Sequence, residues 1–134
     1  GKVVEQLFNQ AKRDADFRVL IVAEEAQNFL SGGGRANRAA TALERVAREG
    51  RKFGVGLLLI SQRPAGLQTD VVAQCNTQII FRLVNPNDLD YIQSTAGAAS
   101  EELLLMLPKL ATGCCNVAGV AVPMAMLAQI DEYR

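Results

Sequence analysis

Histidine is absent from the 134-residue sequence, and cysteine is scarce. The three cysteines, Cys75, Cys114 and Cys115, form no CxxC pair. These absences exclude histidine-based zinc sites, cysteine–histidine nucleophiles and serine–histidine–aspartate triads. An odd number of cysteines without a regular spacing also predicts reduced thiols that pack as small apolar side chains, and it favours an intracellular protein.

An excess of either charge is also absent, because 14 basic residues balance 14 acidic residues. Any electrostatic attraction to nucleic acid must therefore come from local groups rather than from net charge. No apolar run approaches the ~20 residues that span a bilayer, and the sequence shows no signal peptide. Length and composition together predict one soluble, cytoplasmic domain.

Short apolar runs and segments of helical periodicity alternate along the chain. Runs rich in β-branched residues are typical of strands that are covered on both faces, as in parallel sheets. Their alternation with helices predicts an α/β fold with a mostly parallel sheet flanked by helices. Strands are predicted at 18–23, 55–61 and 77–83, helices at 3–15, at 37–53 (ending at Gly54) and from Pro86 (capped by Asn85), and an edge hairpin after residue 113.

Polar side chains follow two of these predicted strands at the point where each strand ends. Glu24 and Glu25 follow the first strand, and Ser61, Gln62 and Arg63 end the second. In open α/β sheets, ligands bind at the carboxyl ends of strands. A carboxylate pair there suits metal-assisted phosphoryl transfer, in which one acid holds Mg²⁺ and the other orients or deprotonates water. The alternative is that both acids pair with surface lysines or arginines, and Arg63 is either a phosphate ligand or a structural arginine.

A basic strip lies on the predicted helix between these two strands. It comprises Arg45, Arg48 and Lys52, with Arg51 at its edge. Such a strip is commonly a solvated face. Its sharper interpretation is an arginine finger, a cation that enters the phosphate site of a neighbouring subunit.

Three stretches of the sequence resemble the HerA family of hexameric DNA translocases and helicases, within the FtsK–HerA branch of P-loop ATPases. They are VLIVAEEAQNF, AREGRKFGVGLLLISQRP and QCNTQIIFRLVNPNDLDYI, in that order along the chain. The resemblance implies a RecA-like P-loop ATPase core that uses ATP and Mg²⁺. It also implies a homohexamer that moves on duplex DNA in end processing or repair, with a possible partner nuclease.

The resemblance also implies a role for individual residues. Glu24 takes the place of the Walker B acid that binds Mg²⁺, and Glu25 that of the catalytic glutamate. Gln62 takes the place of the sensor that contacts the γ-phosphate, and Arg63 is a further candidate for nucleotide binding. Arg51 best matches the arginine finger, and Arg48 is the second choice.

The family's phosphate-binding loop, G-x-x-x-x-G-K-[ST], does not occur in the sequence. The glycine triplet before Arg35 lacks the lysine and the hydroxyl residue, and the chain begins Gly-Lys rather than with methionine. We therefore expect residues 1–134 to be a single partial RecA-like domain, the C-terminal half of the motor's ATPase domain. We expect this chain alone to hydrolyse no ATP.

The stretch SGGGRANR predicts a loop over residues 31–38. Its Arg35 and Arg38 are candidates for contact with DNA phosphates, and a surface loop without a ligand is an equal alternative. Two alternatives to a DNA repair motor also remain. One is a conjugation or secretion ATPase of VirB4/TraG type, and the other is a nonenzymatic interaction domain with a degenerate nucleotide fold.

Overall fold

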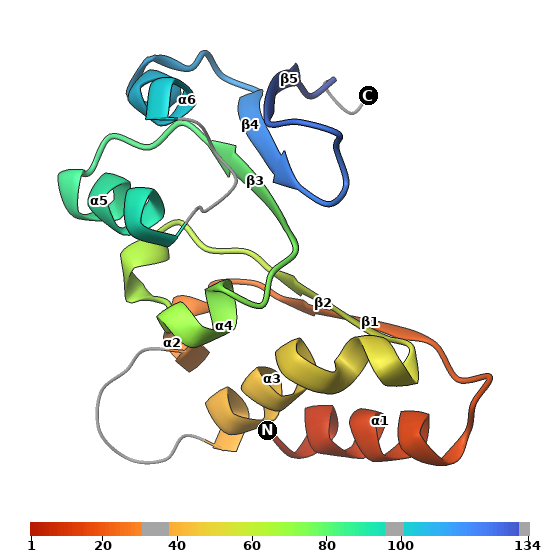
Figure 1. Ribbon diagram of the computed structural model, residues 1–134. Coiled ribbons are helices and arrows are strands. Elements are labelled where there is room, and N and C mark those ends of the chain that lie inside the picture. Colours follow the sequence, from red (N-terminus) through yellow and green to blue (C-terminus); the bar gives the residue numbers. More distant parts are fainter. Residues whose placement is uncertain (31–37, 96–100, 132–134) are drawn as a thin grey trace. The chain divides into compact units, whose positions relative to one another are not determined.

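The computed structural model describes residues 1–30, 38–95 and 101–131, which form helices and strands of an α/β protein (Figure 1). The chain divides into two compact units, Gly1–Gln74 and Cys75–Arg134. Within the described part, no helix is long and apolar enough to cross a membrane.

The first unit contains a parallel pair of strands, β1 (Val19–Ala23) and β2 (Val55–Leu59). Ala23 at the end of β1 lies opposite Leu59 at the end of β2, so both strands finish at the same level. Two predicted strands are thereby confirmed as parallel neighbours. The helices of this unit are α1 (Lys2–Arg13), α2 (Gln27–Leu30), α3 (Arg38–Glu49) and α4 (Thr69–Val72), with 3-10 turns at Gly50–Phe53 and Pro64–Gly66.

The core of this unit lies on one side of the strand pair. Phe8 of α1 and Val46 of α3 are almost completely buried against Val55 of β2. On the other side, the side chains of Leu20 and Val22 are 61% and 50% exposed. The prediction that this strand is covered on both faces is therefore wrong for the described residues. An unbroken apolar run reports that both faces are apolar, and it does not report whether the chain itself supplies a cover.

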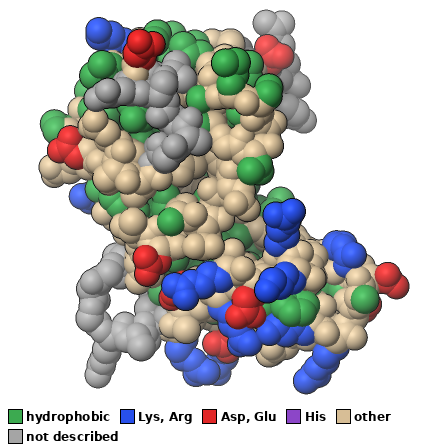
Figure 2. Space-filling view, in the orientation of Figure 1, with side chains coloured by type: hydrophobic (Ala, Val, Ile, Leu, Met, Phe, Trp, Pro, Cys, Tyr) green, Lys and Arg blue, Asp and Glu red, His purple; other side chains and the backbone are tan. Residues whose placement is uncertain are grey.

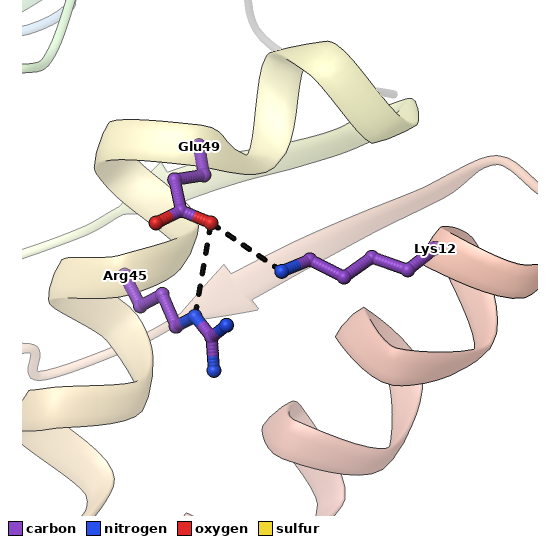
Figure 3. A network of polar contacts seen from close by, with 3 residues as sticks. All are labelled: Lys12, Arg45 and Glu49. Carbon is purple, nitrogen blue, oxygen red and sulfur yellow. Dashed lines mark hydrogen bonds and ion pairs between the residues drawn. The ribbon is translucent and has the colours of Figure 1, made fainter.

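Helices α1 and α3 are joined by a polar network (Figure 3). The Oε2 atom of Glu49 accepts from Lys12 Nζ at 3.4 Å and lies 3.7 Å from Arg45 Nε. The Lys12 ammonium also lies 4.5 Å from the centre of the Phe8 ring and 4.9 Å from that of Phe53. Arg45 of the predicted basic strip is thus engaged within its own unit.

The segment that links α3 to β2 ends where the sequence predicts. Gly54 follows the 3-10 turn and has a φ of 71°, in the left-handed region that favours glycine. Its N–H bonds to the carbonyl groups of Gly50 and Arg51. This cap fixes the point at which the chain reverses into β2.

The second unit contains an antiparallel sheet in the order β3-β4-β5. The predicted edge hairpin, β4 with β5, is confirmed. The expectation that the strand at 77–83 extends a mostly parallel sheet is wrong, because β3 pairs antiparallel with β4. An apolar run indicates a strand but not the direction in which that strand pairs. The elements are β3 (Thr77–Phe81), α5 (Pro86–Thr95), α6 (Glu101–Met106), a 3-10 turn at Leu107–Lys109, β4 (Cys114–Gly119) and β5 (Met126–Gln129).

The start of α5 follows the predicted cap. The side-chain oxygen of Asn85 accepts from the backbone N–H of Asn87 at 2.9 Å, and Pro86 is the first helical residue. The apolar side of the sheet packs on this helix, where Ile80, Ile92 and Leu107 form a buried cluster.

Asn116 of β4 is an exception within this apolar unit. Its side chain is completely buried, and neither amide atom has a hydrogen-bond partner among the described residues. Its neighbours across the sheet are Ile80 and Leu127.

A buried polar group without a hydrogen-bond partner, such as the amide of Asn116, lowers stability by about 1–3 kcal/mol. The exchange Asn116→Val should therefore raise the free energy of unfolding of the 134-residue chain by about 1 kcal/mol or more, measured by urea denaturation.

The matched control for this experiment is Asn76→Val, since Asn76 is an exposed asparagine next to β3. We expect it to change the free energy of unfolding by less than about 0.5 kcal/mol. A loss of stability in the Asn116 variant would contradict the prediction and show that the amide is stabilising.

Candidate active site at the carboxyl ends of β1 and β2

The two loops that leave β1 and β2 are tied together by their backbones. The N–H of Ile60 donates to the carbonyl of Ala23 at 2.9 Å, and the N–H of Ala26 donates back to the carbonyl of Ile60 at 2.9 Å. These bonds extend the parallel pairing past the ends of both strands. They bring the acidic pair and the polar end of the second predicted strand to one edge.

Glu25 has an unusual backbone conformation at this edge. Its φ is 48°, the left-handed region, and among the described residues no other non-glycine residue has a positive φ. This conformation costs of order 1 kcal/mol for a residue with a Cβ. Such strain persists where the surroundings enforce it, and it is frequent at functional sites.

Both carboxylate oxygens of Glu25 accept a hydrogen bond from a glutamine amide. Gln62 Nε2 donates to Oε1 at 2.9 Å, and Gln27 Nε2 donates to Oε2 at 2.5 Å. The Glu25 side chain is half-buried, and Gln62 is exposed. Two donors, one at the start of α2 and one in the loop after β2, fix both the position and the rotation of the carboxylate. The structure therefore brings together two of the predicted site residues, Glu25 and Gln62.

Glu24 differs from Glu25 in exposure and in hydrogen bonding. It is exposed, and in the described part of the chain it makes no hydrogen bond or ion pair. It is thus a free carboxylate at the end of β1. Among the described residues, no group of three or more potential ligands forms a complete metal site. One free carboxylate nevertheless fits Mg²⁺, which binds few protein ligands and completes its shell with water and phosphate oxygens.

Gln27 also belongs to this site, although the sequence patterns did not indicate it. It begins α2, between the buried residues Ala26 and Leu30. Its side-chain oxygen accepts from Ser61 Oγ at 2.5 Å. The one available signal was its spacing, two residues after Glu25, which allows an amide to reach back across a tight turn.

The two candidate arginine fingers have different surroundings. Arg48 is held by Glu44 at 2.8 Å and lies 3.9 Å from Asp70. Arg51 is exposed, and its guanidinium has no ion pair or hydrogen bond in the described part of the chain. Arg63 is also exposed, and its backbone N–H donates to Ser61 Oγ at 3.1 Å. Of the two candidates, Arg51 is the one whose charge is not already paired.

Arg51 lies far from the acid pair of its own chain. It precedes β2, whereas Gln62 follows β2. The five residues of that strand span about 16 Å at about 3.3 Å per residue. An arginine side chain is much shorter than this strand, so Arg51 does not reach Glu25 in the same subunit.

Only one of the two candidate DNA contacts lies in the described part of the chain. Arg35 lies outside the described residues. Arg38 is the first residue of α3 and not part of a loop, and its Nη2 lies 4.0 Å from Glu5 Oε2. The predicted loop therefore ends before Arg38.

The three cysteines have the properties of structural side chains. Burial raises the pKa of the Cys75 thiol, and burial together with the neighbouring Cys114 raises that of Cys115. A raised pKa keeps a thiol protonated at neutral pH and therefore a poor nucleophile. Cys114 donates to Gln129 Oε1 at 2.8 Å, as a structural side chain does.

Comparison with known proteins identifies close relatives of the sequence. The chain is 42% identical to a probable DNA double-strand break repair helicase HerA of Methanocaldococcus jannaschii over 86% of its length. It is 39% identical to the corresponding helicase of Pyrococcus furiosus over 88% of its length. It spans 23% and 21% of these two relatives. No family model matches the chain.

Solved structures share the fold. The DNA-packaging ATPase B204 of Sulfolobus turreted icosahedral virus matches with a TM-score of 0.75 and 22% identity, over 98% of this chain and 62% of that protein. VirB4 of Thermoanaerobacter pseudethanolicus matches with a TM-score of 0.73 and 18% identity, over 98% of this chain and 36% of that protein. The chain therefore shares its fold with B204 and VirB4. The resemblance of the sequence to HerA helicases is confirmed.

Proposed function

The chain resembles a segment of the HerA helicases, and from this premise we propose that it is the C-terminal part of the ATPase domain of a DNA translocase or helicase. Such a motor hydrolyses ATP to act in DNA end processing or repair. The observation that carries the proposal is the contact of Glu25 with Gln62 at the carboxyl edge of two parallel strands. Nucleotide phosphates bind at this edge in open α/β sheets.

The two glutamates divide the work of the site. Glu24 is free to hold Mg²⁺, which neutralises charge on the phosphate oxygens when it is bound. Glu25 is oriented by two amides and keeps acceptor capacity on both oxygens, so it positions the attacking water and takes its proton. Gln62 is exposed and donates to this carboxylate, and its proposed role is contact with the γ-phosphate. Arg63, exposed on the same loop, supplies a further positive charge.

A second subunit completes the proposed site. The length of β2 separates Arg51 from Glu25 of its own chain, and the guanidinium of Arg51 has no ion pair within the part of the chain that the structure describes. Both properties support a role in trans, as expected of a ring such as a homohexamer. Arg48 is less suited, because Glu44 and Asp70 already hold it.

The remaining partners belong to the longer protein. The phosphate-binding lysine is one of them, since the family's phosphate-binding loop does not occur in this sequence, and a partner nuclease is another. For contact with duplex DNA, the candidates within this chain are Arg38, exposed at the start of α3, and Arg35, which lies outside the described residues. The shared fold with VirB4 keeps a conjugation or secretion ATPase as the second candidate. Relatives at about 40% identity that are named as DNA repair helicases favour the first.

ATP hydrolysis by the longer protein that carries this segment should increase severalfold when linear duplex DNA is added, because a translocase couples turnover to movement on its track. The measurement is steady-state phosphate release with and without duplex DNA at constant salt. The control is a variant with the phosphate-binding lysine replaced, which must lose both rates. Hydrolysis that does not respond to duplex DNA would contradict the DNA motor and favour the VirB4-type alternative, and the absence of hydrolysis would favour a nonenzymatic domain.

A further inference from the structure

A series of hydrogen bonds between side chains, which we call the Glu25 network, connects Glu25 to the loop after β2. Glu25 Oε2 accepts from Gln27 Nε2, Gln27 Oε1 accepts from Ser61 Oγ, and Ser61 Oγ accepts from the N–H of Arg63. The three donor–acceptor distances are 2.5, 2.5 and 3.1 Å. None of these contacts belongs to the Glu25–Gln62 pair on which the proposed function rests.

The identity of donor and acceptor in each hydrogen bond of the Glu25 network follows from the functional groups involved. An ionised carboxylate only accepts, so the NH₂ group of Gln27 must face Glu25 and its oxygen must face Ser61. The Ser61 hydroxyl then donates its single proton to Gln27, and its lone pair remains for the N–H of Arg63. Every member of the Glu25 network is satisfied in one arrangement, which is the condition for a polar network to be rigid.

Packing holds Gln27, the central residue of the Glu25 network, in place. Its neighbours Ala26 and Leu30 are completely buried in the core of the first unit. On the side of the loop after β2, Gly66 lies so close that a Cβ at this position would meet Gln27 Cβ at 3.0 Å. The backbone of Gln27 is thus anchored, and its stem is confined by the loop that Ser61 begins.

We propose that Gln27 and Ser61 are positioning residues that hold the Glu25 carboxylate in its hydrolytic orientation. Gln27 acts directly on Glu25, and Ser61 acts through Gln27. The inference rests on the proposed function, since it assigns the support of the catalytic glutamate. Because Ser61 also holds the backbone of Arg63, a shift of that loop is transmitted to Glu25.

The test uses the longer protein with Gln27→Met, Ser61→Ala and both changes together. Methionine keeps the length of glutamine and removes its hydrogen bonds. Misorientation of a catalytic group costs about 10- to 100-fold in rate, so we expect kcat to fall by that factor in Gln27→Met, and less in Ser61→Ala. The KM for ATP should stay within about twofold in both, because the effect is confined to the chemical step. The double variant should be no slower than Gln27→Met, because Ser61 acts through Gln27.

Two further variants sharpen the result. Ser61→Thr keeps the hydroxyl and should retain most of kcat. Gln6→Met is the matched control, since Gln6 is exposed on α1 and its side chain makes no hydrogen bond in the described part of the chain. It should leave kcat and KM unchanged.

Several outcomes would overturn the inference, and they differ from failure of the proposed function. Wild-type kcat in Gln27→Met, together with an inactive Glu25→Gln variant, would reject only the positioning role. Loss of folded protein or a parallel rise in KM would assign Gln27 a structural role instead. Multiplying losses in the double variant would show that Ser61 acts independently of Gln27. An active Glu25→Gln variant would reject the proposed function itself.

Discussion

Replacing Glu25 by glutamine is expected to lower kcat for ATP hydrolysis in the longer protein by about 10²- to 10⁴-fold, the usual contribution of a general base. Glutamine keeps the size of the side chain but cannot take a proton. It also cannot accept hydrogen bonds from both Gln27 and Gln62 in the way the carboxylate does, because one of the two oxygens is replaced by an NH₂ group, which only donates. The measurement is steady-state phosphate release at saturating ATP.

Nucleotide affinity should survive the same exchange. No positive charge is removed from the site, so the Kd for ATP, measured in a binding assay, should change by less than about an order of magnitude. Glu102→Gln, which removes a charge from an exposed position on α6, is the control and should have wild-type kcat. A Glu25→Gln variant within about twofold of wild type would contradict the assignment of Glu25 as the base.

Glu24 and Glu25 have different surroundings, so substitution of Glu24 tests a different function from substitution of Glu25. Glu24 is exposed and unpaired among the described residues, whereas Glu25 is half-buried between two amides. As residue types the two glutamates are equivalent, and only the resemblance to HerA helicases distinguishes their roles at the level of sequence. The structure adds a physical difference, because the backbone of Glu25 lies in the left-handed region.

The arrangement of residues at the candidate site could be predicted because it depends on short-range patterns. A β-branched apolar run predicts a strand, and the polar residues after it mark the strand's end. Two such runs, joined by a helix that ends at Gly54, predict parallel neighbours whose ends coincide. The contact of Glu25 with Gln62 follows from that coincidence, and the structure contains it.

What could not be predicted depends on side-chain rotation and on contacts between distant residues. The side chain of Gln27 accepts a hydrogen bond from Ser61, which lies 34 residues later in the chain. The engagement of Arg48 depends in part on Asp70, on another helix. The direction of β3 is defined by its pairing with β4, more than 30 residues later in the chain. Periodicity and composition carry no information on any of these.

Replacing Arg51 by alanine is expected to reduce kcat of the longer protein by about 10³- to 10⁵-fold, the range for loss of an arginine finger. Arg48→Ala is the matched control, because it removes an arginine from the same basic strip that is already paired with Glu44 and Asp70. Loss of these exposed pairs costs at most about 1 kcal/mol in stability, so kcat should remain near that of wild type. A larger loss of kcat in Arg48→Ala than in Arg51→Ala would exchange the roles of the two arginines.

Mixed assemblies decide whether Arg51 acts on its own subunit or on a neighbour. Subunits with Arg51→Ala retain Glu25, and subunits with Glu25→Gln retain Arg51. If Arg51 acts in trans, mixing two inactive preparations creates interfaces that contain an intact Glu25 and an intact Arg51, and ATP hydrolysis returns. If Arg51 acts within its own subunit, each subunit lacks one essential group and no mixture is active. Since β2 separates Arg51 from Glu25 by more than the length of an arginine side chain, we expect hydrolysis to return on mixing.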